Sequence, residues 1–308
     1  MVKMTATSQA RSSSADWAII PRNISLDWSR VPLQWIYDDR FASLATNGLS
    51  YYLIATEFAM CRLCNEALPY IDDPKLREDV RGFIRQESLH ARAHGKHLTE
   101  FMERHGIEGI PANRFARRLL EEVLVEKPFG KTLPKALKKP WAMFRAGLFA
   151  AGEHYTTGFA NQLLNRLKWD ENGCDPTMSE LLHWHAVEEI EHRTVVFDTF
   201  NALGGSLPVR VVAMSLLFPV MQFLMVSSVT ELSARDTSAP SKKLDLWHPS
   251  FWRSWNSSAK AGNVPSPAWL MTHALSFCLP GYNPADEGST EQAMEYLERM
   301  PFVSVVPR

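Results

Sequence analysis

The chain has 308 residues, of which 45% are hydrophobic, and a formal net charge of −1. This length and composition predict a soluble globular protein with a sizeable core. The near-neutral charge provides no basic field for nucleic acid, so we expect no nucleic-acid partner. Four unevenly spaced cysteines do not resemble a disulfide framework, which favours a reducing, cytoplasmic location.

The segment 1–38 precedes the first predicted helix, and we expect it to be mostly irregular. Its first part, residues 1–17, has no apolar centre of a secretory signal peptide. This part is rich in serine and threonine and has no acidic residue before Asp16, a weak resemblance to a transit peptide. A disordered tail is the favoured interpretation of residues 1–17.

Helical signals dominate residues 39–232. The first helix is predicted from about Arg40 to Leu68, and Asp73–Pro74 supplies a cap and a first-turn proline for the second. The later helices are predicted to cover about 74–105, 113–126, 140–169, 176–203 and 208 onward. No strand-like alternation interrupts this region. The sequence therefore predicts an all-α fold, an antiparallel four-helix bundle with additional helices.

The remaining segment, 233–308, is rich in serine, proline, lysine and tryptophan and contains a short predicted helix within 289–300. We expect it to form an extension packed on the bundle. A homodimer is left open.

The stretch Val211–Thr230 carries no charge over about 20 residues, which is the length needed to span a bilayer. Pro219 and Gln222 within it argue against a span. We expect a buried core helix. A membrane-associated or substrate-lining helix and, last, a true span remain alternatives, so association with a membrane or lipid through 211–230 is left open.

The stretch "LLHWHAVEEIEHRTVVF" places acids and histidines where a helix should bury an apolar stripe. At 100° per residue, His185 and His192 lie about 40° and 60° from Glu189, on the stripe itself. Glu191 points away and Glu188 lies at the rim, as surface acids would. We therefore expect Glu188 and Glu191 to be dispensable for metal binding.

The second helix repeats the arrangement, because Glu87 and His90 form another Glu-x-x-His pair one turn apart. The first and third helices each carry a single acid among apolar neighbours, Glu57 and Glu153. One Glu-x-x-His pair is common by chance. Four buried carboxylates, however, would cost several kcal/mol each unless cations neutralised them. The set predicts a metal centre.

This order of Glu, Glu-x-x-His, Glu, Glu-x-x-His resembles the ferritin-like di-iron carboxylate proteins. The resemblance covers about residues 40–205. It implies two iron ions, with manganese or mixed manganese and iron as alternatives, and it makes Glu87 and Glu153 plausible bridging ligands. The metal ligands and catalytic residues that it implies are Glu57, Glu87, His90, Glu153, Glu189 and His192.

A finer resemblance comes from His185, because His-x-x-x-Glu-x-x-His is similar to the arylamine N-oxygenase branch, which adds a histidine to the site. His185 is then a further metal ligand; the alternative is a hydrogen-bonded core histidine. The stretches "ESLHARAH", "GEHYTTGFA" and "WHAVEEIEHRTVVFD" also resemble a bacterial family of predicted metal-dependent hydrolases.

Several other residues are assigned structural roles. His94 and His97 continue the ligand face and are expected to be core histidines, with a place beside the ligands as the alternative. His154 points about 100° away from its neighbour Glu153, so we expect no ligand role. Cys61 and Cys64 are expected to be buried thiols.

The resemblance favours an O2-activating oxidase or oxygenase acting on a small, largely apolar organic substrate. Such an enzyme needs an external electron donor, since no flavin or nicotinamide motif is present. The alternative is a metal-dependent hydrolase, in which two metals activate a water molecule.

Overall fold

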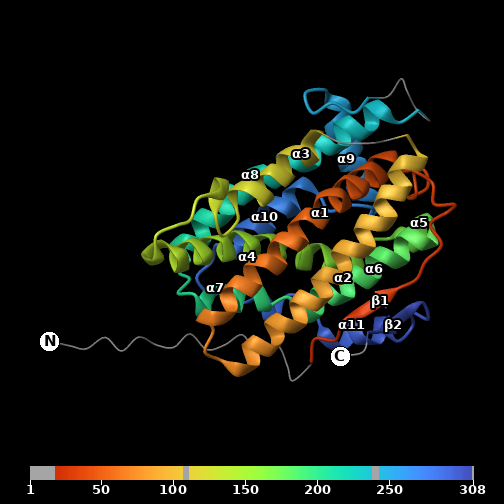
Figure 1. The fold of residues 1–308 in the computed structure, drawn as a ribbon. Helices are drawn as coiled ribbons and strands as arrows, with labels where there is room; N and C mark the ends of the chain where they lie inside the picture. The colour runs from red at the N-terminus through yellow and green to blue at the C-terminus, as the bar shows by residue number, and fades with distance from the viewer. Residues whose placement is uncertain (1–17, 107–110, 238–242, 307–308) are drawn as a thin grey trace.

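The computed structural model describes residues 18–106, 111–237 and 243–306, and its fold is all-α, as predicted (Figure 1). The predicted disordered tail, residues 1–17, lies outside the described residues. The helices are α1 (Arg40–Ala67), α2 (Pro74–Arg104), α3 (Pro111–Arg118), α4 (Lys135–Asn165), α5 (Trp169–Asn172), α6 (Pro176–His192), α7 (Val195–Ala202), α8 (Leu207–Arg235), α9 (Pro249–Ala261), α10 (Pro267–Phe277) and α11 (Thr290–Leu297).

Four of these helices form the bundle that carries the metal-centre candidates. α1 and α2 are an antiparallel hairpin, and α4 pairs with α6; α1 also contacts α4, and α2 contacts α6. The predicted caps form, since the Asp73 side chain accepts from the amide of Lys75 and Asp175 accepts from Thr177. Each cap is followed by a proline, which has no amide hydrogen and therefore leaves no unsatisfied donor in the first turn.

Two of the long helices differ from the prediction, and the short helix predicted at 113–126 ends as an α-helix at Arg118. α4 begins at Lys135, so Pro140 lies inside the helix rather than at its start. The fourth predicted helix is divided into α6 and α7, because the chain turns at Arg193 and Thr194. The Arg193 guanidinium donates to the carbonyl of Ile190, the acceptor that the Thr194 amide would use if the helix continued.

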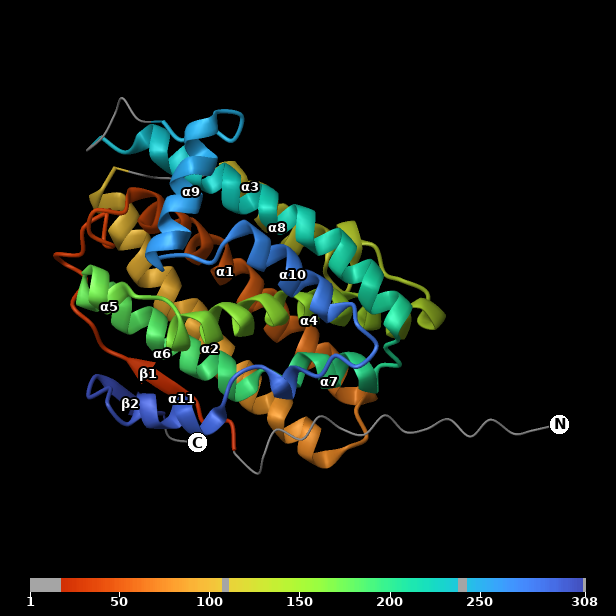
Figure 2. The same cartoon turned by 180° about the vertical axis from the view of Figure 1, so that it is seen from behind.

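A small sheet was missed by the sequence analysis. β1 (Arg22–Ile24) pairs antiparallel with β2 (Val303–Val305), near the two ends of the described chain. Strands of three residues are too short to produce a detectable alternation. β1 contacts α2, and α11 covers α6, so the segments flanking the bundle enclose its ligand-bearing helices (Figure 2).

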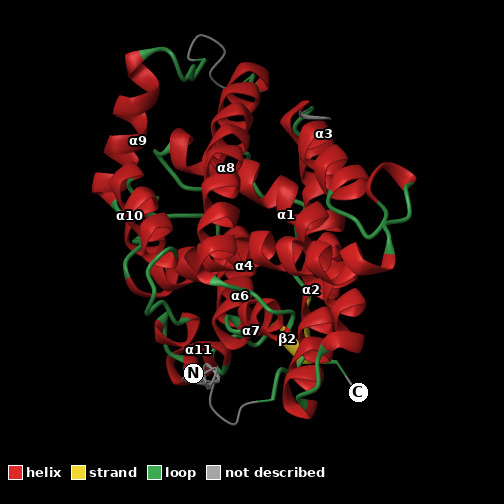
Figure 3. Cartoon of the chain, turned by 90° about the vertical axis from the view of Figure 1, so that its left-hand side faces the viewer, coloured by secondary structure: helices red, strands yellow, loops and turns green. Residues whose placement is uncertain are grey.

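The expectation of a buried core helix is wrong for most of α8. Only 22% of its most apolar 18-residue window is buried. One side packs closely on the bundle, since a Cβ on Gly48 of α1 would lie 2.7 Å from the Cβ of Ser228. α8 lies between α3 and α10, and its outer side is left uncovered by the described residues (Figure 3). α8 is also the one described helix that is long and apolar enough to cross a membrane.

Candidate metal centre

Four helices bring the predicted ligands together inside the bundle. α1 contributes one acid, α4 another, and α2 and α6 each contribute a Glu-x-x-His pair. No residue of the set exceeds 3% exposure: Glu57, Glu87, His90, Glu153, Glu189 and His192. The structure therefore gathers all six residues in one buried place, together with His185, which is 5% exposed.

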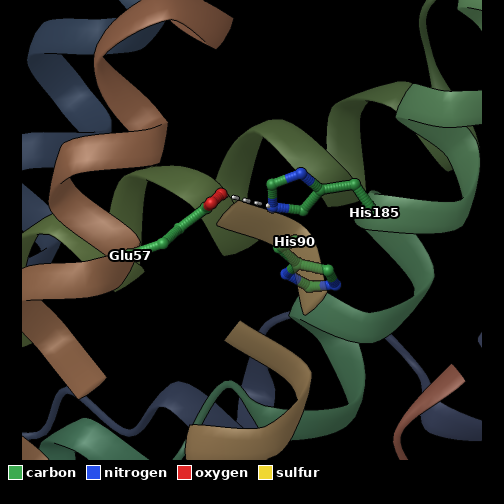
Figure 4. Close-up of side chains that lie close together, drawn as sticks. All are labelled: Glu57, His90 and His185. Carbon is green, nitrogen blue, oxygen red and sulfur yellow. Dashed lines mark ion pairs between the residues drawn. The ribbon is translucent and has the colours of Figure 1, made fainter. Parts of the chain in front are cut away.

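One group of ligand atoms joins three helices (Figure 4). Glu57 of α1, His90 of α2 and His185 of α6 offer atoms that lie within 4.8 Å of one another. His185 Nε2 and Glu57 Oε1 are 3.8 Å apart. One carboxylate and two imidazoles at this separation can hold one ion.

A second group lies between α4 and α6. His192 Nε2 is 3.5 Å from Glu153 Oε2 and 3.6 Å from Glu189 Oε2. The same nitrogen is 3.4 Å from Glu87 Oε1. Three carboxylates thus surround a single imidazole nitrogen.

Two carboxylates lie between the groups. Glu87 Oε1 is 3.2 Å from His90 Nδ1 as well as 3.4 Å from His192 Nε2. Glu189 also reaches both sides, because Oε1 is 2.7 Å from His185 Nε2 and Oε2 faces His192. Each of these two carboxylates therefore lies beside histidines of both groups. The expectation that Glu87 and Glu153 bridge two metal ions stays a prediction.

The inward atoms of this cluster have no protein partner. Both carboxylate oxygens of Glu57 and of Glu153, one oxygen of Glu87 and the Nε2 atom of His192 are buried without a hydrogen bond. Such atoms cost free energy unless something binds them. Six oxygen and nitrogen donors converging from four helices fit divalent metal ions, and their grouping fits two.

The electrostatics agree with a site that needs cations. Burial, with repulsion from neighbouring carboxylates, raises the pKa of Glu57 and of Glu153 well above the usual value of 4.5. Burial also opposes ionisation of Glu189, but the imidazoles of His192 and His185 outweigh it and lower the pKa of Glu189. Some of the negative charge is therefore left uncompensated by the protein.

The prediction that Glu188 and Glu191 lie on the surface is wrong. Glu188 is 0% exposed and Glu191 is 6% exposed. They lie behind the ligands, where His90 Nε2 donates to Glu188 Oε2 at 2.9 Å. Arg22 of β1 donates to Glu188 at 3.2 Å and to Glu191 at 2.6 Å. β1 and α11 cover this side of α6, which would face solvent in an isolated bundle.

The network continues to the other ligand histidine. Gln86 Nε2 donates to Glu191 Oε2 at 2.8 Å, and Gln86 Oε1 accepts from His192 Nδ1 at 3.0 Å. Arg22 thus stands in the middle of an unbroken chain of hydrogen bonds between His90 and His192. Such partners fix the ring orientation of metal-binding histidines and raise their basicity.

Comparison with known proteins identifies a family that matches most of the chain. The family model described as predicted metal-dependent hydrolase matches residues 20–288. The chain belongs to this family of predicted metal-dependent hydrolases. Nothing matches it among the curated proteins or among the solved structures.

In this predicted metal-dependent hydrolase, His94 supports His185. His94 Nε2 and His185 Nδ1 are 2.6 Å apart. Burial, together with the neighbouring His185, keeps the pKa of His94 well below 6.5, so His94 is neutral and its Nε2 can accept a hydrogen bond from His185 Nδ1. His185 Nε2 faces the cluster, 2.7 Å from Glu189 Oε1. His97, by contrast, stacks on Trp28 away from it.

The other assigned residues lie outside the centre. His154 hydrogen-bonds to Tyr282 and to the carbonyl of His273, joining α4 to the C-terminal extension. Cys61 and Cys64 are buried free thiols. The expectation of buried thiols is confirmed for Cys61 and Cys64.

Sequence reasoning missed three residues of the surrounding hydrogen-bond network, two of which contact candidate ligands directly. Arg22 and Gln86 belong to the network described above, and Thr156 Oγ1 donates to Glu189 Oε2 at 2.5 Å. Arg22 lies in a segment without periodicity, so no sequence signal could have found it. Thr156 could have been found, because it follows Glu153 by one helical turn.

Proposed function

We propose that the protein is an enzyme with a dinuclear metal centre, and that its reaction is hydrolysis by a metal-activated water. The buried, partnerless ligand atoms of Glu57, Glu87, Glu153 and His192 carry the proposal of the centre. Membership of the predicted metal-dependent hydrolase family supports the reaction. Two bound metal ions would lower the pKa of a water between them and polarise the bond that it attacks.

The residues of the chain would hold and orient this centre. Glu57, His90 and His185 form one position, and Glu153 with His192 forms the other. Glu87 and Glu189 would span the two. Thr156 fixes Glu189 by a hydrogen bond, while Gln86 holds His192 Nδ1 so that Nε2 faces inward.

An O2-dependent oxidase or oxygenase is the second candidate. The four carboxylates with two or three histidines, which resemble the ferritin-like di-iron set, favour it, because hard oxygen ligands suit the higher oxidation states of iron. His185 adds the extra histidine of the arylamine N-oxygenase resemblance. The burial of every ligand also suits a diatomic molecule and a small, largely apolar organic substrate. This reaction needs an external electron donor.

Metal analysis followed by two assays separates the candidates. The protein is purified without oxygen or chelator, and iron, manganese and zinc are counted per chain. O2 uptake is measured after anaerobic reduction, and hydrolysis of small apolar esters and amides is measured without reductant. Hydrolysis that needs the metal and leaves O2 unchanged supports the first candidate. Stoichiometric O2 consumption with a new optical band supports the second and contradicts the first.

The His185→Ala variant tests the third histidine in either case. If His185 is a ligand, metal content falls in part, and the optical spectrum of a Co2+-substituted centre changes. If His185 only packs beside the ligands, the spectrum and the metal content stay those of the unmodified protein.

A further inference from the structure

An uncovered apolar face runs over three neighbouring helices. α8 contacts both α3 and α10 (Figure 3). We call this the apolar face, and its exposed residues are Phe115, Val212, Leu216, Phe223, Met271, Leu275 and Leu279. Each of them is at least 47% exposed. The rings of Phe115 and Phe223 meet edge to face at 5.9 Å, so the face is continuous from α3 to α8.

The spacing shows that these residues form ridges. Val212, Leu216 and Phe223 follow one side of α8, with Pro219 between them, and Met271 and Leu275 follow one side of α10. The apolar window of α8 has a mean hydropathy of 2.0, yet most of it is not buried. Soluble proteins seldom leave a contiguous apolar surface of this kind without a partner.

Positive charge lies at one end of the face. The segment Lys127–Lys139 contains five lysines and no acid, and its Phe129 is 63% exposed with a left-handed φ of 51°. A Cβ on Gly147 of α4 would lie 3.5 Å from Ala213 of α8, so the earlier part of α4 reaches past the start of α8 (Figure 1). Lys127, Lys131 and Lys135 have no ion-pair partner among the described residues.

Exposed tryptophans lie at the other end. The amide of Leu244 donates to Ser233 Oγ near the end of α8, which holds the following segment beside that helix. This segment and α9 carry Trp247, 90% exposed, and Trp252, 42% exposed. Lysine and tryptophan flanking an apolar helix face are the features that hold a peripheral protein at a membrane interface.

We propose that the apolar face binds an anionic lipid surface, with α8 lying along the interface rather than crossing the bilayer. A crossing would remove Val229 and Leu232 of α8 from the core, where both are 0% exposed. Anionic lipid supplies a partner for both the apolar residues and the lysines. A second copy of the chain could also cover the apolar residues, and the test distinguishes it by the oligomeric state. This proposal is independent of the reaction at the metal centre.

Vesicle sedimentation of the full chain tests the proposal. One set of vesicles is phosphatidylcholine alone, and the other is phosphatidylcholine mixed with phosphatidylglycerol. We expect binding to the mixed vesicles that weakens as salt is raised. Leu216→Ser and Leu275→Ser should each weaken it by about tenfold, since each removes a buried leucine from the lipid contact. Replacing Lys131 and Lys135 with glutamine should reduce the salt dependence.

Val305→Ser is the matched control, because Val305 is 64% exposed on β2, away from the apolar face. It should bind the mixed vesicles like the unmodified protein. Two results would overturn the proposal. One is no binding to the mixed vesicles, or equal binding to both sets. The other is a dimer in light scattering that Leu216→Ser and Leu275→Ser convert to monomer, which would assign the face to a second copy.

Discussion

Two clusters of buried acids lie on opposite sides of α6, and they differ in whether protein groups compensate their charge. Behind the ligands, Glu188 and Glu191 share Arg22 as a counter-ion, and their hydrogen-bonding partners come from the protein. Inside the bundle, Glu57 and Glu153 are equally buried and have no partner for either oxygen. The same residue type is thus compensated on one side of the helix and left uncompensated on the other.

This difference indicates that the outer acids stabilise the fold, whereas the inner acids are suited to bind metal ions. A chain that had to bury acids only for stability would supply a cation to both clusters, as it does with Arg22. Among the described residues, the inner cluster has histidines but no arginine or lysine ion pair, and metal ions would neutralise its remaining charge. The satisfied cluster in turn orients the two ligand histidines of the unsatisfied one.

Arg22→Ala gives the largest expected effect, because it breaks the compensated cluster. Glu188 and Glu191 would then be buried without their cation, which should lower the free energy of unfolding of the metal-free protein by about 3–5 kcal/mol. Urea unfolding measures this loss. Arg92→Ala, at an exposed position of α2, is the control and should change stability by less than about 0.5 kcal/mol. An unchanged urea midpoint for Arg22→Ala would show that Arg22 does not compensate the charges of Glu188 and Glu191.

Glu188→Ala tests whether the outer cluster serves the inner one. The sequence analysis expected Glu188 to be dispensable for metal binding, but the structure places Glu188 against His90 Nε2. Its loss should therefore lower metal affinity by about 10–100-fold. Competition with a coloured chelator measures the affinity. Glu180→Ala, on a partly exposed turn of the same helix, should leave it unchanged. Equal affinities for all three proteins would mean that Glu188 has no part in holding the metal.

Glu57→Gln should have a much smaller effect on the metal-free protein, although it removes a ligand. The pKa of Glu57 is raised, so its carboxyl already tends to be neutral without metal, and the amide is nearly isosteric. We expect the metal-free stability to stay within about 1 kcal/mol or to increase. Metal binding should be lost at the same time. A large loss of metal-free stability would place Glu57 with the compensated acids.

A pH series sharpens the same contrast. Because the folded-state pKa values of Glu57 and Glu153 are raised, their protonation stabilises the metal-free fold fully below about 4.5. That contribution is lost as the pH rises through the raised pKa values. The Glu57→Gln, Glu153→Gln double variant lacks this loss, so its stability relative to the unmodified protein should grow with pH. A constant difference between the two proteins would show that neither carboxyl is perturbed.

The inner cluster could be predicted from the sequence because its motif is repeated on different helices. Two Glu-x-x-His pairs and two isolated acids in apolar helices are recognisable without coordinates. The outer cluster could not be predicted, since a helical wheel gives the direction of Glu191 but not what covers that side. Its cover comes from β1, which has no periodic signal, and from α11, far away in the sequence. The same limit applies to α8, whose composition predicts burial but does not reveal that neighbours cover only part of it.

Metal content per chain tests the central claim most directly. The protein is isolated without chelator, and bound metals are counted by elemental analysis beside the Glu57→Gln, Glu153→Gln double variant. We predict two ions per chain in the unmodified protein, and a folded double variant that retains neither. An unmodified protein that carries no metal, and whose unfolding temperature does not rise with added Fe2+, Mn2+ or Zn2+, would contradict the assignment of a metal centre.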